Sequence, residues 1–250
     1  MTRWTDPVTD PHPDRRGQER ADTTMMGVVH DAIRRDLHRL HRVMAPSDDP
    51  LPAARRAAVC DHTLWMMDFL HRHHRGEDEG LWPMLLQRAP QTAPLIARME
   101  ADHHAILPAM QDVDAAARAF RHDPKAQNGL AAALDDLSTV LLPHLRREED
   151  EAMPVVASAL TVQDWLSWDQ RYNVRGKSLT HLAMDGHWLM DQLDPDRYRT
   201  LVHLVPPPAR LLIVKGFAGR YRRACALRWG ADIPVRPLAA SADPTHGPPR

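Results

Sequence analysis

The stretch "FLHRHHRGEDEGLWPML", residues 69–85, places three histidines and three acidic residues beside apolar side chains. A second stretch, "LLPHLRREEDEAMPVV" at residues 141–156, repeats this arrangement. Both contain the pattern H-x-x-x-E-x-x-x-x-x-P, which runs through His73, Glu77 and Pro83 in the first stretch and through His144, Glu148 and Pro154 in the second. Two copies of so unusual a spacing indicate that both stretches serve the same structural purpose.

The composition excludes several classes of protein. The chain has 250 residues, 32 basic and 33 acidic, so its overall charge gives no strong attraction to nucleic acid or to a membrane. Cys60 and Cys225 are far apart and form no C-x-x-C pattern, which is typical of reduced, buried thiols in a cytoplasmic protein. No apolar run reaches the roughly 20 residues that a membrane-spanning helix needs. We expect a cytoplasmic protein that binds no nucleic acid.

The chain divides into four parts by composition. Residues 1–22 are rich in Pro, Asp and Arg and are expected to form a disordered leader, and residues 235–250 a disordered tail. Between residues 23 and 160 every long segment has helical periodicity. Residues 161–234 are expected to form a helical extension.

Three breaks divide residues 23–160 into four helices. They are "APSDDP" at 45–50, "APQTAP" at 89–94 and the pair Asp123-Pro124, in which an N-cap precedes a first-turn proline. Four amphipathic helices with short connections predict an all-α fold, an up-and-down antiparallel four-helix bundle with a C-terminal helical extension.

Each predicted helix carries a stripe of residues spaced by threes and fours that is expected to face the core. The stripes are largely apolar but include six polar residues, namely His30, His73, Glu77, His103, His144 and Glu148. A buried carboxylate without a partner costs several kcal/mol, and a metal ion would compensate histidine and glutamate together. Because residues at i and i+4 share a helical face, each His-x-x-x-Glu pair can reach one site.

The arrangement of these six residues predicts a dinuclear site. The chain forms two helical hairpins, and each supplies one histidine and then a histidine with a glutamate. The two carboxylates can bridge a pair of metal ions while imidazoles bind each ion from outside. Nitrogen and oxygen ligands without thiolate suit iron or manganese, and zinc would also bind.

This motif set resembles the hemerythrin-like HHE cation-binding domain. The strings "HDAIRRDL", "HHRGEDEGLWPML" and "ADHHAI" are similar to its helix signatures, and the resemblance covers roughly residues 25–158. It implies a non-haem di-iron centre, with an oxo or hydroxo bridge, inside a four-helix bundle. Oxygen-carrying members bring a second histidine from the third helix, where this chain has Met99, and they use H-x-x-x-x-D on the fourth helix. These departures favour redox chemistry or sensing over reversible oxygen carriage.

Several alternatives to the six-residue set remain open. His74 and Asp78 also share an i, i+4 face, but only His73 and Glu77 match the fourth helix. Asp78 and Glu149 follow the two glutamates directly and are read as solvated surface acids, with hydrogen bonding to the imidazoles as the alternative. The remaining candidates are His104, His41 and the ferritin-like half-motif Glu100-x-x-His103, all judged weaker.

The extension has its own sequence features. Thr161-x-x-Asp164 resembles a capping box, and residues 176–193 and 209–230 are expected to form helices. Residues 197–230 carry eight Arg or Lys and no acid. The segment 209–230 is therefore read as a basic amphipathic helix that caps the bundle. Peripheral contact with an anionic membrane is an alternative, and contact with nucleic acid or a phosphorylated ligand is the weakest one because no recognised binding motif accompanies it. Tyr172, His181 and His187 are candidates to control access to the bundle.

Three functions fit the sequence. The first is a di-iron enzyme that removes peroxide or another small oxidant in oxidative stress, with catalase-like turnover as one form of this activity. The second is a sensor that binds O2 or NO without turnover, and the third is an iron or zinc site with a structural or storage role. The sequence assigns no catalytic residue.

Overall fold

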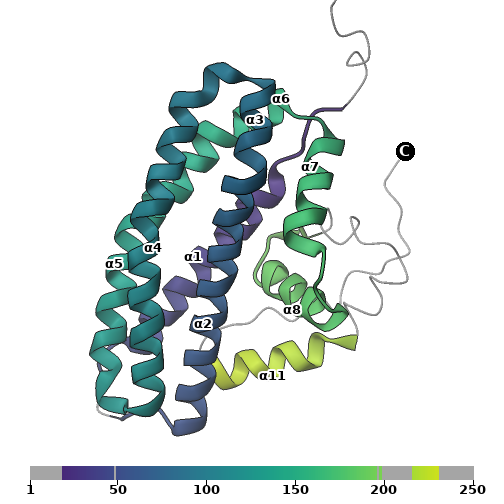
Figure 1. The fold of residues 1–250 in the computed structure, drawn as a ribbon. Helices are drawn as coiled ribbons and strands as arrows, with labels where there is room; N and C mark the ends of the chain where they lie inside the picture. Colours follow the sequence, from purple (N-terminus) through teal and green to yellow (C-terminus); the bar gives the residue numbers. More distant parts are fainter. Residues whose placement is uncertain (1–18, 48, 196, 199–215, 231–250) are drawn as a thin grey trace, which may run out of the picture.

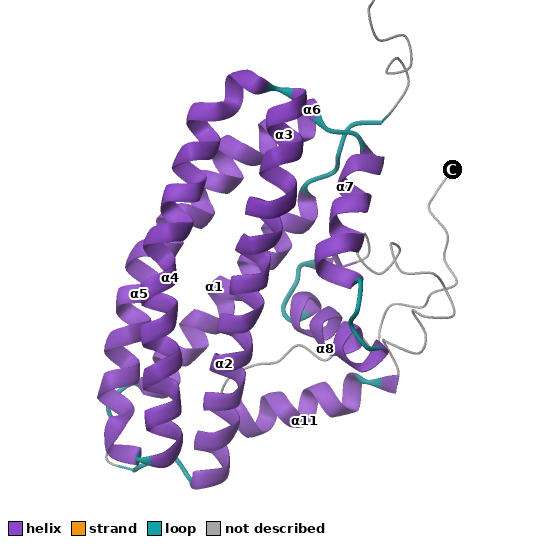
Figure 2. Ribbon diagram, viewed as in Figure 1, coloured by secondary structure: helices purple, strands orange, loops and turns teal. Residues whose placement is uncertain are grey.

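A computed structural model of the protein describes residues 19–47, 49–195, 197–198 and 216–230 (Figure 1). Within these ranges all regular structure is helical, and the only β-type pairing is one isolated bridge between Arg20 and Thr161 (Figure 2). The expected all-α class is confirmed. No described helix combines the length and apolarity that crossing a membrane requires.

Four long helical segments lie side by side and form the bundle (Figure 1). The first segment is α1 (Thr24–Met44), and the second runs through α2 (Ala53–Gly76), the π-helix η2 (Glu77–Leu81) and α3 (Trp82–Arg88). The third is α4 (Ala93–His122), which follows the short 3₁₀ turn η3 (Pro90–Thr92). The fourth follows the turn η4 (Pro124–Ala126) and runs through α5 (Gln127–Arg147), the π-helix η5 (Glu148–Ala152) and α6 (Met153–Ala159). Each segment begins and ends close to the predicted breaks.

Prolines and polar caps set these breaks. At the start of the fourth segment the carboxylate of Asp123 accepts a hydrogen bond from the backbone N–H of Lys125, while Pro124 occupies the first turn. Proline costs little there because first-turn N–H groups have no helical partner. The third segment opens in the same way, with a proline in its first turn.

The core of the bundle consists of two apolar clusters with a polar layer between them. On α1, His30 lies between Met26 of one cluster and Ile33 of the other. On α4, His103 lies between Met99 and Ile106 in the same way. The two clusters therefore enclose the polar layer from both ends of the bundle.

The extension packs along one side of the bundle, next to α1 and α2 (Figure 1). It comprises α7 (Val162–Asp169), the π-helix η6 (Gln170–Val174), α8 (Leu179–Met190) and α11 (Ala218–Trp229). The capping box of Thr161 and Asp164 is present. Of the predicted helix 209–230, residues 209–215 lie outside the described ranges and residues 218–229 are helical.

A buried carboxylate ties the extension to the bundle. Asp36 of α1 accepts hydrogen bonds from the indole Nε1–H of Trp188 at 2.8 Å and from Nε2 of His62 at 2.7 Å. Arg39 also donates to Asp36, at 2.9 Å, and to Asp191 at 2.7 Å. Both carboxylate oxygens of Asp36 have donors, from the bundle and from the extension, so Asp36 joins the two parts.

The two chain ends are described only in part. At the end of the expected leader, the N–H of Ala21 donates to the carbonyl of Leu160 at 3.1 Å, and the N–H of Val162 donates to the carbonyl of Glu19 at 3.0 Å. Residues 1–18 of that leader and the expected tail, residues 235–250, lie outside the described ranges.

Candidate metal centre

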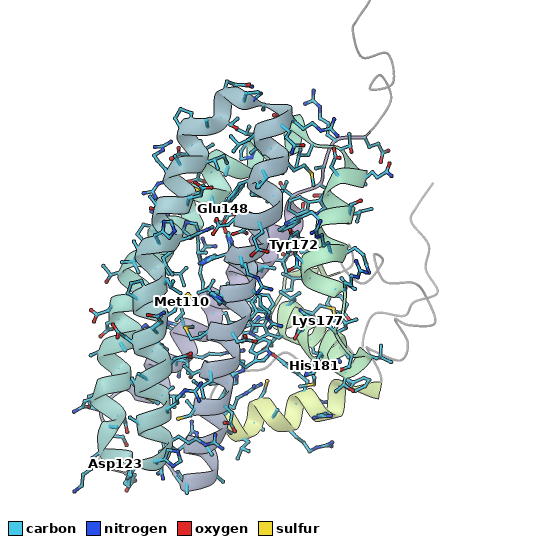
Figure 3. The ribbon with its side chains drawn as sticks, in the orientation of Figure 1. Met110, Asp123, Glu148, Tyr172, Lys177 and His181 are labelled. Carbon is cyan, nitrogen blue, oxygen red and sulfur yellow. The ribbon has the colours of Figure 1, made fainter. Side chains whose placement is uncertain are left out.

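All six residues predicted from the sequence point into the polar layer of the bundle. His30, Glu77 and Glu148 are fully buried, and the remaining three are at most 6% exposed. Figure 3 shows Glu148 enclosed among the four long segments. The structure thus brings together residues from all four segments, as the duplicated motif predicts.

The first cluster of donor atoms consists of His30, His73 and Glu148. The Nε2 atoms of His30 and His73 are 3.4 Å apart, and Nε2 of His30 lies 3.3 Å from Oε2 of Glu148. One donor atom from each of the three residues lies within 4.8 Å of the others. This spacing fits one cation bound by two imidazoles and a carboxylate.

The second cluster consists of His74, His103 and His144. One donor atom from each of these residues also lies within 4.8 Å of the others. The rings of His74 and His103 stack with centroids 4.2 Å apart, and the rings of His103 and His144 meet edge to face at 4.7 Å. Nε2 of His74 is buried and has no hydrogen-bond partner among the described residues.

His74 was missing from the predicted set because it was treated as an alternative to His73. In the structure both histidines lie in the polar layer, since neighbouring residues on a helix point in directions about 100° apart and so reach different halves of the layer. One sequence feature could have revealed this. The third helix has Met99 where oxygen-carrying members have a second histidine, and His74 supplies an imidazole beside His103 of that helix.

Each glutamate lies close to imidazoles of both clusters. Oε1 of Glu77 is 3.1 Å from Nε2 of His73, and its Oε2 is 3.5 Å from Nε2 of His103. Oε2 of Glu148 is 3.3 Å from Nε2 of His30 and 3.7 Å from Nε2 of His144. Both carboxylates therefore touch one imidazole of each cluster, which is the position of a bridging ligand.

The carboxylate oxygens of Glu77 and Glu148 are buried and accept no hydrogen bond within the described part of the chain. Nε2 of His103 and Nε2 of His144 lack hydrogen bonds as well. An unpaired buried polar group costs about 1–3 kcal/mol, and more when it is charged. Such a concentration of unsatisfied acceptors fits a bound cation, so the residues present suit a metal centre.

Carboxylates outside the layer orient two of the imidazoles through hydrogen bonds. Nδ1 of His30 lies 2.8 Å from Oε1 of Glu149, and Nδ1 of His103 lies 2.7 Å from Oδ1 of Asp78. Nδ1 of His144 is 3.5 Å from a carboxylate oxygen of Asp102. The interpretation of Asp78 and Glu149 as surface acids is wrong. An Nδ1–H held by a carboxylate leaves the Nε2 lone pair directed at the centre.

The electrostatics of the layer favour cation binding. Burial lowers the pKa of His73 to about 3 and of His144 to about 4, so both imidazoles are neutral near pH 7. Burial alone would lower the pKa of His30. The negative charges of Glu148 and Glu149 and their hydrogen bonds have a larger effect, and they raise the pKa of His30 to about 8. Burial together with the neighbouring Glu148 raises the pKa of Glu77 well above its ordinary value. A cation between the two carboxylates would remove this repulsion.

Comparison with known families agrees with this geometry. The family model described as the hemerythrin HHE cation binding domain matches residues 22–156, more than half of the chain. The chain belongs to the hemerythrin HHE family. Searches of curated proteins and of solved structures gave no significant match.

In this HHE domain, both glutamates begin a π-helix. The N–H of Trp82 bonds to the carbonyl of Glu77, and the N–H of Met153 bonds to the carbonyl of Glu148, five residues apart in each case. Each π-helix leads directly into a proline, Pro83 or Pro154, in the next first turn. Proline lacks an N–H and its ring clashes with the carbonyl four residues earlier, which disfavours ordinary α-helix at this point. The shared motif therefore encodes a local widening of the helix at each glutamate.

Two aromatic side chains of the extension donate hydrogen bonds to the backbone in and just before the π-helix of Glu77. The indole Nε1–H of Trp168 donates to the carbonyl of Gly76 at 2.7 Å, and the hydroxyl of Tyr172 donates to the carbonyl of Glu79 at 3.2 Å. Pro83, four residues after Glu79, has no N–H to offer that carbonyl. A Cβ atom added at Gly80 would lie 2.4 Å from the Tyr172 ring, so only glycine allows this approach.

The weaker candidates do not enter the centre. Glu100 and His104 are exposed on α4, which excludes the ferritin-like half-motif. His41 lies 3.1 Å from the hydroxyl of Ser138, away from the donor clusters. Of the candidates to control access, His181 is exposed and His187 stacks on Tyr221 in the extension.

Proposed function

We propose that this HHE domain binds a pair of iron ions and uses them to act on a small oxidant, namely hydrogen peroxide, O2 or NO. The observation that carries the proposal is the position of Glu77 and Glu148, each in contact with one imidazole of each cluster. A carboxylate with two oxygens is the simplest ligand that joins two cations. His30 and His73 would bind one ion, and His74, His103 and His144 would bind the other.

Iron is proposed over the other cations because of the donor set. The donors are imidazole nitrogens and carboxylate oxygens, without thiolate, which suits iron and manganese and also admits zinc. Both cysteines are buried apart from the two clusters, and burial raises the pKa of Cys60 to about 11, so this thiol is unsuited to metal binding.

The proposed activity follows from the number of donors. When bound, a pair of iron ions supplies one-electron and two-electron redox chemistry. Five imidazole nitrogens and the oxygens of two carboxylates would hold the ions, and they would leave coordination positions for solvent or a small oxidant. The chain's own residues contribute orientation: Glu149 and Asp78 hold the outer nitrogens of His30 and His103, so that their inner nitrogens face the centre. The apolar clusters on both sides limit the entry of water.

Peroxide turnover tests the proposal. The iron-loaded protein is mixed with hydrogen peroxide in an oxygen electrode, with His71→Ala as a control, because His71 is exposed on the same helix as His73 and His74. Oxygen evolution that is lost in Glu77→Ala and retained in His71→Ala supports an oxidant-removing enzyme. A stable optical adduct with O2 or NO and no turnover favours the sensor function instead. A colourless zinc protein favours a structural or storage site.

A further inference from the structure

A cavity of about 200 Å³ lies where the extension meets the bundle. Its walls come from α1 and α2 on one side and from α7, η6 and α8 on the other, and His73 of the first donor cluster forms part of the wall. Most of the remaining wall is apolar and aromatic, with contributions from Met26, Val29, Phe69, Trp165, Trp168 and Leu182. Pockets for drug-sized ligands are larger, at about 300–1,000 Å³. The volume therefore suits a molecule with a single ring or a compact branched chain.

Three ionisable side chains of the extension line this cavity. Lys177 donates to Oδ2 of Asp185 at 2.8 Å and lies over the ring of Phe69, and Figure 3 shows Lys177 where the extension meets the bundle. Asp169 is the third, and its Oδ1 accepts a hydrogen bond from the side-chain amide of Asn173 at 3.0 Å. Lys177 balances the charge of one of the two carboxylates, so the lining keeps one net negative charge. Burial raises the pKa of Asp169, which means that its charge is poorly solvated.

Gly186 keeps one wall of the cavity open. It lies in the middle of α8, where glycine costs about 1 kcal/mol relative to alanine. Its backbone has no positive φ, and a Cβ atom added there would meet no heavy atom within 4 Å. Neither conformation nor packing therefore requires glycine at this position, in contrast to Gly80, where packing does.

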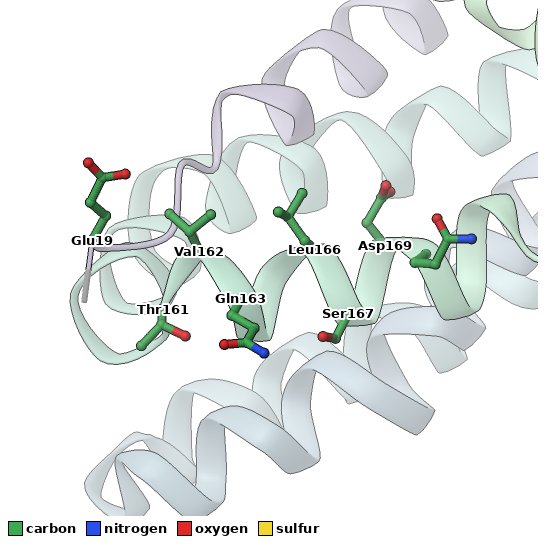
Figure 4. Close-up of a pocket in the computed structure, with 8 residues that line it drawn as sticks. Glu19, Thr161, Val162, Gln163, Leu166, Ser167 and Asp169 are labelled. Carbon is green, nitrogen blue, oxygen red and sulfur yellow. The ribbon is translucent and has the colours of Figure 1, made fainter. Parts of the chain in front are cut away.

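The wider hollow along the outer face of α7 has different chemistry (Figure 4). It is lined by Glu19, Thr161, Gln163, Ser167 and the exposed Leu166, and Asp169 also borders it. Its two carboxylates have no cation in the lining, but it contains no aromatic ring or imidazole and so lacks the apolar enclosure that a small ligand with an aromatic body needs.

We infer that the cavity between the extension and the bundle binds a small primary amine with an aromatic or branched aliphatic body, with its ammonium group donating to Asp169 and its body lying against Phe69, Trp165 and Trp168. The charge balance selects a cation, and the aromatic walls select the body. The bound molecule would rest against His73, so this site adjoins the metal centre. The inference concerns a second ligand and holds whichever metal the centre binds.

Isothermal titration of the full chain tests this inference with benzylamine, benzyl alcohol and benzoate, which share a ring and differ in charge. Benzylamine is expected to bind about tenfold more tightly than benzyl alcohol, since one charge-assisted hydrogen bond is worth about that factor, and benzoate more weakly than either. Equal affinities, tighter binding of benzoate, or no binding of benzylamine would overturn it. The titration is carried out on metal-free and on iron-loaded protein. Benzylamine binding to the metal-free protein supports this inference whether or not the proposed iron site is correct.

Two variants locate the bound amine. Gly186→Leu fills the wall and should abolish benzylamine binding, while Gly186→Ala adds one methyl group and should retain it with a higher melting temperature. Asp169→Asn removes the charge and should reduce the preference for benzylamine over benzyl alcohol to less than about twofold. Unchanged binding in Gly186→Leu, or an unchanged preference in Asp169→Asn, would contradict the assignment. The Asp169 variant remains informative if Gly186→Leu fails to fold.

Discussion

The indole of Trp168 donates a hydrogen bond to the carbonyl of Gly76, which directly precedes the buried carboxylate of Glu77. Helix α7 is thereby fixed against the π-helix that directs Glu77 into the polar layer. The glycine at position 80 allows the two aromatic rings of the extension to come this close. The second glutamate, Glu148, has no such support from the described part of the extension, so the two halves of the centre differ in how they are held.

Replacing Trp168 with Phe should weaken both the fold and metal retention. The change removes the indole donor to the carbonyl of Gly76, and the loss of this hydrogen bond is expected to lower the free energy of unfolding by about 0.5–1.5 kcal/mol. It should also speed the loss of metal to a chelator. Trp165→Phe is the matched control, because Trp165 stacks near Trp168 without bonding to the π-helix. Equal chelator rates in the two variants would show that the hydrogen bond does not position Glu77.

Replacing His74 with Ala should reduce the metal content from two ions per chain to one. His74 lies against His103 and His144, so its loss removes one donor of the second cluster and none of the first. His71→Ala, an exposed histidine three residues earlier, should keep both ions. Elemental analysis of the two variants after iron loading makes the comparison. Two ions retained in His74→Ala would exclude His74 as a ligand.

Replacing Glu77 with Leu should stabilise the metal-free protein while preventing it from binding metal. In the absence of a cation, Glu77 is a buried carboxyl group without a hydrogen bond, and burial raises its pKa. An apolar side chain of similar size removes that cost, which is about 1–3 kcal/mol. Denaturant unfolding in the presence of a chelator measures the difference. A less stable Glu77→Leu protein would mean that Glu77 serves the fold rather than the metal.

Acidification should destabilise the contact between the extension and the bundle. Burial, together with Arg228, lowers the pKa of His62 to about 4 from an ordinary value of 6.5. The unfolded chain therefore binds a proton at a higher pH than the folded chain, and stability falls as the pH drops from about 6.5 to about 4, by about 3 kcal/mol at most. The pH dependence of unfolding for His62→Gln should be flatter than for the wild type over this range. Parallel curves would contradict the assignment.

The sequence was sufficient to predict the bundle because periodicity and proline positions act locally. The helix ends at Met44, Arg88 and His122 depend on residues within a few positions of each break. The same holds for the capping box that starts α7. The six polar stripe residues could also be predicted, since a stripe that is otherwise apolar shows which way each helix faces.

Other features depend on contacts between distant residues, so the sequence did not reveal them. His74 becomes part of the centre because α2 faces two neighbouring segments at once. The bonds from Glu149 to His30 and from Asp78 to His103 cross between segments, and a surface position along one helix gave no indication of them. The π-helices are an intermediate case. Pro83 and Pro154 signalled a change in the helix, but only the structure gives its form.

The number of metal ions per chain tests the central claim most directly. The purified protein is loaded with ferrous iron without oxygen, passed through a desalting column and analysed for metal. Two clusters joined by Glu77 and Glu148 predict two iron ions per chain, with the absorption of an oxo-bridged pair after exposure to air. A content of one ion per chain, or of none, would contradict the shared centre.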